Sequence, residues 1–186
     1  EPNDNLCLAG GIALNCVANT RVKSKFKNIH VPPFPNDTGL AIGMAMYAHH
    51  QIHGAPKDSN YFVPYLGPEY SDELVADACH HSGYSYKKMD LDYLVDYLCS
   101  RQPIVMCRGR SESGPRALGN RSIMCVPDMK NGRDFLNFKI KQREWYRPYA
   151  PIILDKYVDD ILEDYLPESP YMSTSGTIKK EWRYKL

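Results

Sequence analysis

The feature that most constrains the fold is an alternation of short apolar runs and helical segments over residues 5–50. The first apolar run ends on Gly10-Gly11 and the second on Pro32-Pro33, so each is stopped by residues that favour turns. Residues 40–50 are apolar or small on nearly every side, which predicts a helix buried between layers. Strands that alternate with helices indicate an α/β unit. The expected elements are strands at residues 5–9 and 29–31 and helices at residues 12–25 and 40–50.

Residues 51–70 carry glycine, proline and tyrosine without periodicity, which predicts a linker and a domain boundary within it. We therefore expect one domain over residues 1–55, a linker over 56–70 and a second domain over 71–186. In the second domain Ser71 should cap the first helix. Its expected elements are helices at residues 72–81, 91–100, 133–144 and 155–165, and strands at 84–89, 103–107, 121–126 and 149–154.

Composition excludes several classes of protein. No apolar run approaches the roughly 20 residues that a membrane span needs, and the acidic, polar residues 1–5 do not resemble a signal peptide. The six cysteines form no C-x-x-C pair and mostly lie in apolar runs, which predicts buried thiols in a reducing cytoplasm. Because an apolar run begins at Leu6 without an initiator methionine, we expect a piece of a longer protein.

Positive charge is concentrated in residues 101–150, which hold eleven Lys/Arg against four Asp/Glu, although the whole chain has a net charge of only +1. Most of these basic residues are arginines, whose planar groups match phosphate oxygens in pairs. Gly114, Pro115 and Gly119 predict a rigid turn that presents Arg116 and Arg121. We interpret the stretch as a phosphate site; the alternative is a basic, solvated face.

The helix expected at residues 133–144 would place Asn137, Lys141 and Glu144 on one polar face, at i, i+4 and i+7. Arg147 lies just past its end and could turn back across the same cleft. Arg143, two residues from Lys141, should then face away.

Two features of the first domain could hold a ligand. Gly10-Gly11, between a strand and a helix, could present backbone N–H groups to an anion, with Asn15 one turn into the helix; the alternative is a tight turn with a solvated Asn. Asp37 precedes the apolar helix and could be an N-cap or a metal ligand. The histidines His49, His50 and His53 lie at the far end of that helix, too far away to share a metal with Asp37.

Several sequence blocks resemble the nodulation-protein-type carbamoyltransferases, which include O-carbamoyltransferases of antibiotics and sugars. The blocks are LAGGIALNCVANTRV, VPPFPNDTGLAIGMAMY, YLGPEYS, GRSESGPRALGNRSIMCVPD and NFKIKQREWYRPYAPIIL, and the resemblance covers residues 6–171. Ser113 departs from the family, which usually has an aromatic residue there.

The resemblance implies the end of an actin-like ATPase domain, similar to the threonylcarbamoyl transferase of tRNA modification. It also implies the start of an α/β domain like the threonylcarbamoyl-adenylate synthases. The second domain would make carbamoyladenylate from carbamoyl phosphate and ATP, and the first would transfer the carbamoyl group to a hydroxyl. The expected catalytic residues are Lys141, Arg147, Arg116 and Arg121; the expected nucleotide-binding residues are Gly10, Gly11, Asn15 and Gly39.

Asp37 would bind a divalent metal of iron type, with Mg²⁺ accompanying ATP. Two metal-binding histidines and two phosphate-binding blocks are expected outside this chain, so the chain alone should be inactive. We expect a cytoplasmic protein with small-molecule substrates and neither nucleic acid nor membrane as partner; a homodimer is left open. The alternatives are a tRNA threonylcarbamoyl-modification enzyme and a non-catalytic nucleotide- or phosphate-binding module.

Overall fold

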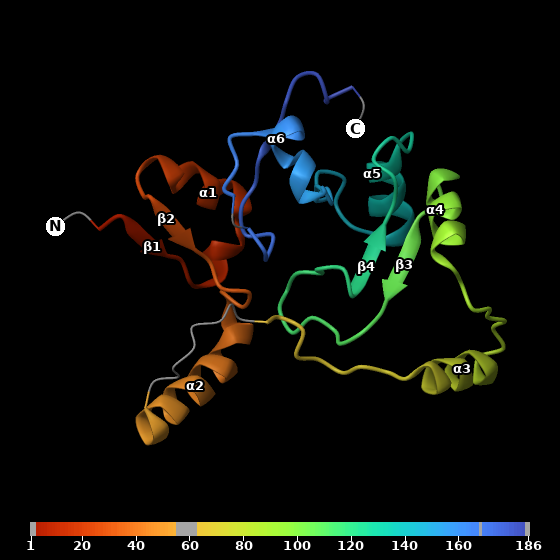
Figure 1. The fold of residues 1–186 in the computed structure, drawn as a ribbon, viewed down its shortest axis with the longest axis horizontal. Coiled ribbons are helices and arrows are strands. Elements are labelled where there is room, and N and C mark those ends of the chain that lie inside the picture. Colours follow the sequence, from red (N-terminus) through yellow and green to blue (C-terminus); the bar gives the residue numbers. More distant parts are fainter. Residues whose placement is uncertain (1–2, 55–62, 168, 185–186) are drawn as a thin grey trace. The chain divides into compact units, whose positions relative to one another are not determined.

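The computed structural model describes residues 3–54, 63–167 and 169–184 (Figure 1). The chain divides into two compact units, each of which combines segments that are far apart in sequence. Unit 1 comprises Glu1–Gly67, Ser111–Leu118 and Leu162–Thr177, and unit 2 comprises Pro68–Arg110, Gly119–Ile161 and Ile178–Leu186. Residues 56–62 of the predicted linker lie outside the described residues, and the predicted domain limits stay a prediction.

Unit 1 begins with a parallel pair of strands, β1 (Asn5–Cys7) and β2 (Asn28–His30), with Leu6 opposite Ile29. Parallel strands need a crossover connection, and here it is helical. It consists of the 3-10 turn η1 (Gly11–Leu14), the helix α1 (Cys16–Arg21) and the 3-10 turn η2 (Val22–Ser24). After β2 the chain forms the turn η3 (Asp37–Gly39) and the helix α2 (Leu40–His53). The predicted α/β alternation is thus confirmed (Figure 1).

Two expectations for unit 1 are wrong. The single helix expected at residues 12–25 is interrupted at Asn15, whose extended ψ of 87° breaks the helical path. The helix α2 is not buried between layers, since none of its residues is buried and Leu40, Met44 and Tyr47 are all more than 60% exposed. Apolar composition favours burial, but burial itself depends on what packs over the helix.

Later segments of the chain complete unit 1. Ser113 N donates to Pro64 O over 2.8 Å, and Asn19 Nδ2 donates to Ser173 O over 2.8 Å. Ser175 N donates to Thr20 Oγ1 over 2.7 Å, so the segment at residues 173–175 is hydrogen-bonded along α1. The buried side chains of this unit include Ala13, Val31, Phe34 and Tyr171.

Unit 2 contains the helices α3 (Asp72–His81) and α4 (Leu91–Cys99), capped by Ser71 and Asp90. The strands β3 (Ile104–Cys107) and β4 (Arg121–Met124) pair antiparallel, with Val105 opposite Ile123 (Figure 1). The helical turn α5 (Gly132–Asp134) continues as the π-helix η4 (Phe135–Ile140). The later elements are η5 (Asp155–Tyr157), α6 (Val158–Ile161), β5 (Leu162–Glu163, in unit 1) and β6 (Thr177–Ile178, at the unit boundary).

Several expectations for the second half are also wrong. Residues 84–89 and 149–154 form no strand, and the helix expected at residues 155–165 ends at Ile161. The helix expected at residues 133–144 ends at Ile140. All six cysteines are free thiols, but the prediction that they are buried is wrong: Cys7, Cys99 and Cys107 are exposed and the other three are intermediate.

Among the described residues, no helix is long and apolar enough to cross a membrane.

Candidate functional site

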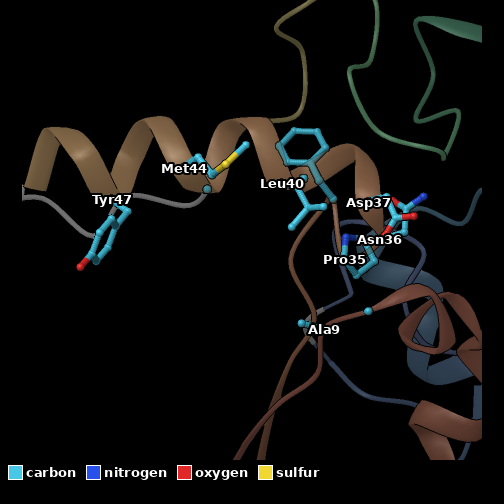
Figure 2. A pocket seen from close by; sticks show the side chains of 11 residues that line it. Ala9, Pro35, Asn36, Asp37, Leu40, Met44 and Tyr47 are labelled. Carbon is cyan, nitrogen blue, oxygen red and sulfur yellow. The ribbon is translucent and has the colours of Figure 1, made fainter.

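An open hollow of about 480 Å³ lies where the parallel strands of unit 1 end. Ala9 and Gly10 follow β1, and residues 34–39 follow β2, so both loops that line the hollow leave the carboxyl ends of the strands. Figure 2 shows Leu40, Met44 and Tyr47 in succession along α2, with Pro35 and Asp37 near the start of the helix and Ala9 on the neighbouring turn. In α/β proteins ligands bind in the crevice outside the carboxyl ends of parallel strands.

Three of the residues singled out in the sequence meet at this hollow: Gly10, Asp37 and Gly39 line it. Gly11 and Asn15 do not. The N–H of Gly10 donates to Pro35 O over 2.6 Å, so that group joins the two loops and is not available to an anion.

Two of the glycines that line the hollow, Gly10 and Gly39, are required by local geometry. Gly10 has φ 88° and ψ 167°, a region that side chains other than hydrogen rarely allow. Gly39 has an ordinary φ of −82°, but a Cβ atom there would lie 2.2 Å from Phe34 O. The close approach at Gly39 lets the loop fold back against the start of α2.

Asp37 is exposed at the rim of the hollow, at the first position of η3. The N-cap position of η3 is Asn36 and that of α2 is Gly39, so the alternative interpretation of Asp37 as an N-cap is wrong. Within residues 3–54, 63–167 and 169–184, no three His, Cys, Asp or Glu side chains gather as a metal site would need. A single carboxylate does not make a metal site, so Asp37 could supply one ligand of such a site and no more.

Asn15 lies at the start of α1, not one turn into a helix as expected. Its Oδ1 atom accepts a hydrogen bond from Ala18 N over 3.1 Å, the usual geometry of an N-cap. Its position is therefore explained by helix capping, and a contact with a nucleotide stays a prediction.

Arg116 and Arg121 both donate to backbone carbonyls. Arg116 Nη2 lies 2.5 Å from Leu14 O in unit 1. In unit 2, Arg121 donates to the carbonyl oxygens of Arg108, Asn120, Pro68 and Gly109, over 2.7, 3.0, 3.3 and 3.2 Å. Both guanidinium groups thus form hydrogen bonds that connect separate segments of the backbone. Phosphate binding by them stays a prediction.

Lys141 and Arg147 lie on the exposed loop at residues 141–149, directly after η4. Arg147 Nε lies 2.8 Å from Glu144 Oε2, and both side chains are about half exposed. A hydrogen bond from its own backbone N–H, followed by the charge of Arg147, lowers the pKa of the Glu144 carboxyl. Solvent screens a half-exposed pair of this kind, so Arg147 can exchange Glu144 for another anion at small cost.

The expectation that Arg143 faces away from Asn137 is wrong. Arg143 Nε donates to Asn137 Oδ1 over 2.7 Å, and its guanidinium carbon lies 4.7 Å from the centre of the Tyr149 ring. Two departures from an α-helix explain this: η4 is a π-helix, and it ends before Lys141. The spacing rule for i, i+4 and i+7 therefore does not apply.

Sequence reasoning missed the role of Asn137, which is 0% exposed. The one signal is an amide between the apolar residues Leu136 and Phe138, whereas the helical spacing predicts Asn137 on one polar face with Lys141 and Glu144.

Comparison of the sequence with known proteins identifies the family of the chain. Two family models match the chain in succession, "Carbamoyltransferase N-terminus" over residues 2–46 and "Carbamoyltransferase C-terminus" over residues 95–186, and together they cover well over half of it. The chain belongs to the carbamoyltransferase family, which confirms the resemblance stated above.

Relatives match nearly the whole chain. The chain is 40% identical to the uncharacterized protein sll1178 of Synechocystis over 98% of its length, covering 32% of that protein. It is 37% identical to nodulation protein U of Rhizobium tropici, over 98% of the chain and 30% of the relative. With nodulation protein NolO of Bradyrhizobium diazoefficiens the identity is 35%, over 90% of the chain and 32% of the relative. The chain thus spans about a third of the length of these relatives.

Proposed function

We propose that the protein containing this chain is a carbamoyltransferase that activates a carbamoyl group as an adenylate and transfers it to an acceptor hydroxyl. The observation that carries the proposal is the order of the family segments: an N-terminal segment and a C-terminal segment follow each other in one chain. A protein with both segments could carry out the formation of carbamoyladenylate and the transfer of the carbamoyl group in one chain.

In the proposed first half-reaction, carbamoyl phosphate, ATP and water give carbamoyladenylate, phosphate and pyrophosphate. The carbamoyl-phosphate linkage is cleaved by water, and the resulting carbamate oxygen attacks the α-phosphorus of ATP while the bond to the β-phosphate breaks. Negative charge accumulates on the phosphate oxygens, and fixed cations stabilise it. Lys141 and Arg147, exposed on the loop at residues 141–149, would bind the donor phosphate, with Arg116 and Arg121 as further cations. Mg²⁺ would accompany ATP.

In the proposed second half-reaction, the acceptor hydroxyl attacks the carbamoyl carbon and AMP leaves. The hollow at the ends of β1 and β2 is the candidate nucleotide site, with Gly10 and Gly39 in its lining and Gly11 and Asn15 beyond it. Asp37 at its rim would be one ligand of a divalent metal whose other ligands come from outside the described residues.

The proposal includes the domain organisation. Residues 1–55 would end an actin-like transfer domain, 56–70 would link the domains, and 71–186 would begin a domain like the threonylcarbamoyl-adenylate synthases. Small molecules would be the substrates, and ATP and carbamoyl phosphate fit a cytoplasmic location.

The test uses the complete open reading frame that encodes this chain. We expect pyrophosphate release from ATP that depends on carbamoyl phosphate, and labelled carbamoyl groups on an added hydroxyl compound. Nucleotide binding without turnover would favour the non-catalytic alternative. Pyrophosphate release that requires threonine and bicarbonate in place of carbamoyl phosphate would favour tRNA modification. The 186-residue chain alone should transfer nothing, and transfer by it would show that the sites are misplaced.

A further inference from the structure

Asn137 is the centre of a hydrogen-bond cluster in unit 2 that uses the full capacity of its side chain. Its Nδ2 group donates to Trp145 O over 3.3 Å and to Arg147 O over 3.1 Å. Its Oδ1 atom accepts from Arg143 Nε over 2.7 Å and from Tyr149 OH over 3.0 Å. A carboxamide has two N–H donors and two acceptor lone pairs, so all four are used.

All four partners lie in the loop at residues 141–149, which carries the basic residues Lys141, Arg143 and Arg147. The backbone adds two more bonds, from Arg143 N to Asn137 O over 2.9 Å and from Lys141 N to Leu136 O over 2.8 Å. The loop lies largely at the surface, so its shape depends on these bonds more than on packing.

The burial of Asn137 requires that its polar atoms find hydrogen-bond partners within the protein. Asn137 is fully buried, and an amide without partners in such a place is strongly unfavourable, so the loop must present its carbonyls and Arg143 at the right positions. The bond from Lys141 N to Leu136 O spans five residues, as in a π-helix, a form that is rare and frequent at functional sites. The local geometry therefore serves to direct Asn137 towards the loop.

We propose that Asn137 is a positioning residue that fixes the loop at residues 141–149 in the shape in which its basic side chains bind the donor phosphate. Asn137 itself touches no substrate in this role. The inference rests on the proposed function, since it takes carbamoyl phosphate as the donor.

The decisive variant is Asn137→Asp in the complete protein. It keeps the size of the side chain and both acceptors, but it loses the two N–H donors to the carbonyls of Trp145 and Arg147. A matched control exists in unit 1, where Asn19 is 4% exposed and its Nδ2 donates to Ala13 O and Ser173 O, over 2.7 and 2.8 Å. Asn19→Asp therefore removes two equivalent bonds far from the loop in sequence.

Two measurements are made on both variants. The first is the rate of limited cleavage by trypsin after Lys141 and Arg143, which reports the order of the loop without any reaction. The second is the KM for carbamoyl phosphate in pyrophosphate release, compared with the KM for ATP. For Asn137→Asp we expect faster cleavage and a rise of about tenfold or more in the KM for carbamoyl phosphate. The KM for ATP should change much less, and Asn19→Asp should change neither measurement.

A general loss of stability would affect both variants and both KM values, so that pattern would overturn the inference. Unchanged cleavage in Asn137→Asp would do the same, and so would a loosened loop with an unchanged KM for carbamoyl phosphate. If Asn137→Asp does not fold, Tyr149→Phe replaces it: it removes one bond to Asn137 Oδ1 and should give a smaller change in the same direction. If the wild-type protein releases no pyrophosphate, the proposed function is wrong. The cleavage rates would still show whether Asn137 fixes the loop.

Discussion

Gly39 and Gly43 both line the hollow of unit 1, yet a methyl group should have opposite effects at the two positions. At Gly39 the added Cβ would meet Phe34 O at 2.2 Å, so the backbone must shift. At Gly43, inside α2, nothing lies within 4 Å. We expect Gly39→Ala to lower the free energy of unfolding by about 1–3 kcal/mol. Gly43→Ala should raise it by up to about 1 kcal/mol, because alanine favours helix. Urea unfolding measures both, and equal effects would contradict the close approach at Gly39.

Arg121 allows a test of whether its guanidinium group is structural. It donates to four backbone carbonyls, and the single ammonium group of a lysine cannot form all four of these hydrogen bonds. We expect Arg121→Lys to lower the free energy of unfolding by about 1.5–3 kcal/mol. Arg133→Lys is the control, because Arg133 is 58% exposed and its contact with Asp134 is 3.5 Å long; its effect should stay within about 0.5 kcal/mol. Unchanged stability with weaker phosphate binding would instead assign Arg121 to the substrate.

The residues of the hollow could be found from sequence, whereas the role of Asn137 could not. Gly10, Asp37 and Gly39 lie beside the turns that end the two strands, and parallel strands bring such turns to one edge. The cluster around Asn137 depends on a π-helix and on a loop that folds back onto it. Neither has a periodic signal, because residue spacing predicts faces only for regular helices and strands.

At the scale of elements, the helix α1 gives a prediction that separates capping from ligand binding. Asn15 Oδ1 caps its first turn by accepting from Ala18 N. We expect Asn15→Ala to lower the free energy of unfolding by about 1 kcal/mol, whereas Asn15→Ser, which can still cap, should be nearly neutral. Thermal unfolding of both variants gives the comparison. If Asn15→Ser is as stable as the wild type but loses carbamoyl transfer, Asn15 also contacts the nucleotide.

Three of the wrong expectations, the strands at residues 84–89 and 149–154 and the burial of α2, share one physical cause. Residues 84–89 and 149–154 have the composition of strands, but a strand exists only where a neighbour pairs with it. The burial of α2 likewise requires another element to pack against the helix, and the composition of α2 alone does not determine whether one does. The N-caps Ser71 and Asp90 involve contacts within one turn, which explains why the sequence was sufficient for the starts of α3 and α4.

At the scale of the whole molecule, the family is evident from the order of its sequence blocks, whereas the division into units is not. Each unit takes in segments from distant parts of the chain: the segment at residues 173–175, within the C-terminal family match, is hydrogen-bonded to α1, within the N-terminal match. Such contacts join residues more than 150 positions apart, and local patterns carry no information about them.

The two proposed half-reactions should be separable by two single substitutions in the complete protein. Asp37 lies in unit 1 and Lys141 in unit 2, and both are exposed, so each change to alanine should alter stability by no more than about 0.5 kcal/mol. We expect Asp37→Ala to abolish carbamoyl transfer and lower the bound metal while leaving pyrophosphate release intact. Lys141→Ala should slow pyrophosphate release about 10²–10³-fold, the usual loss when a contact to a developing anion is removed. It should still transfer carbamoyl groups from carbamoyladenylate supplied directly. If Asp37→Ala keeps full metal and full transfer, Asp37 is not a ligand; if Lys141→Ala fails equally with supplied adenylate, the division of labour between the two segments is wrong.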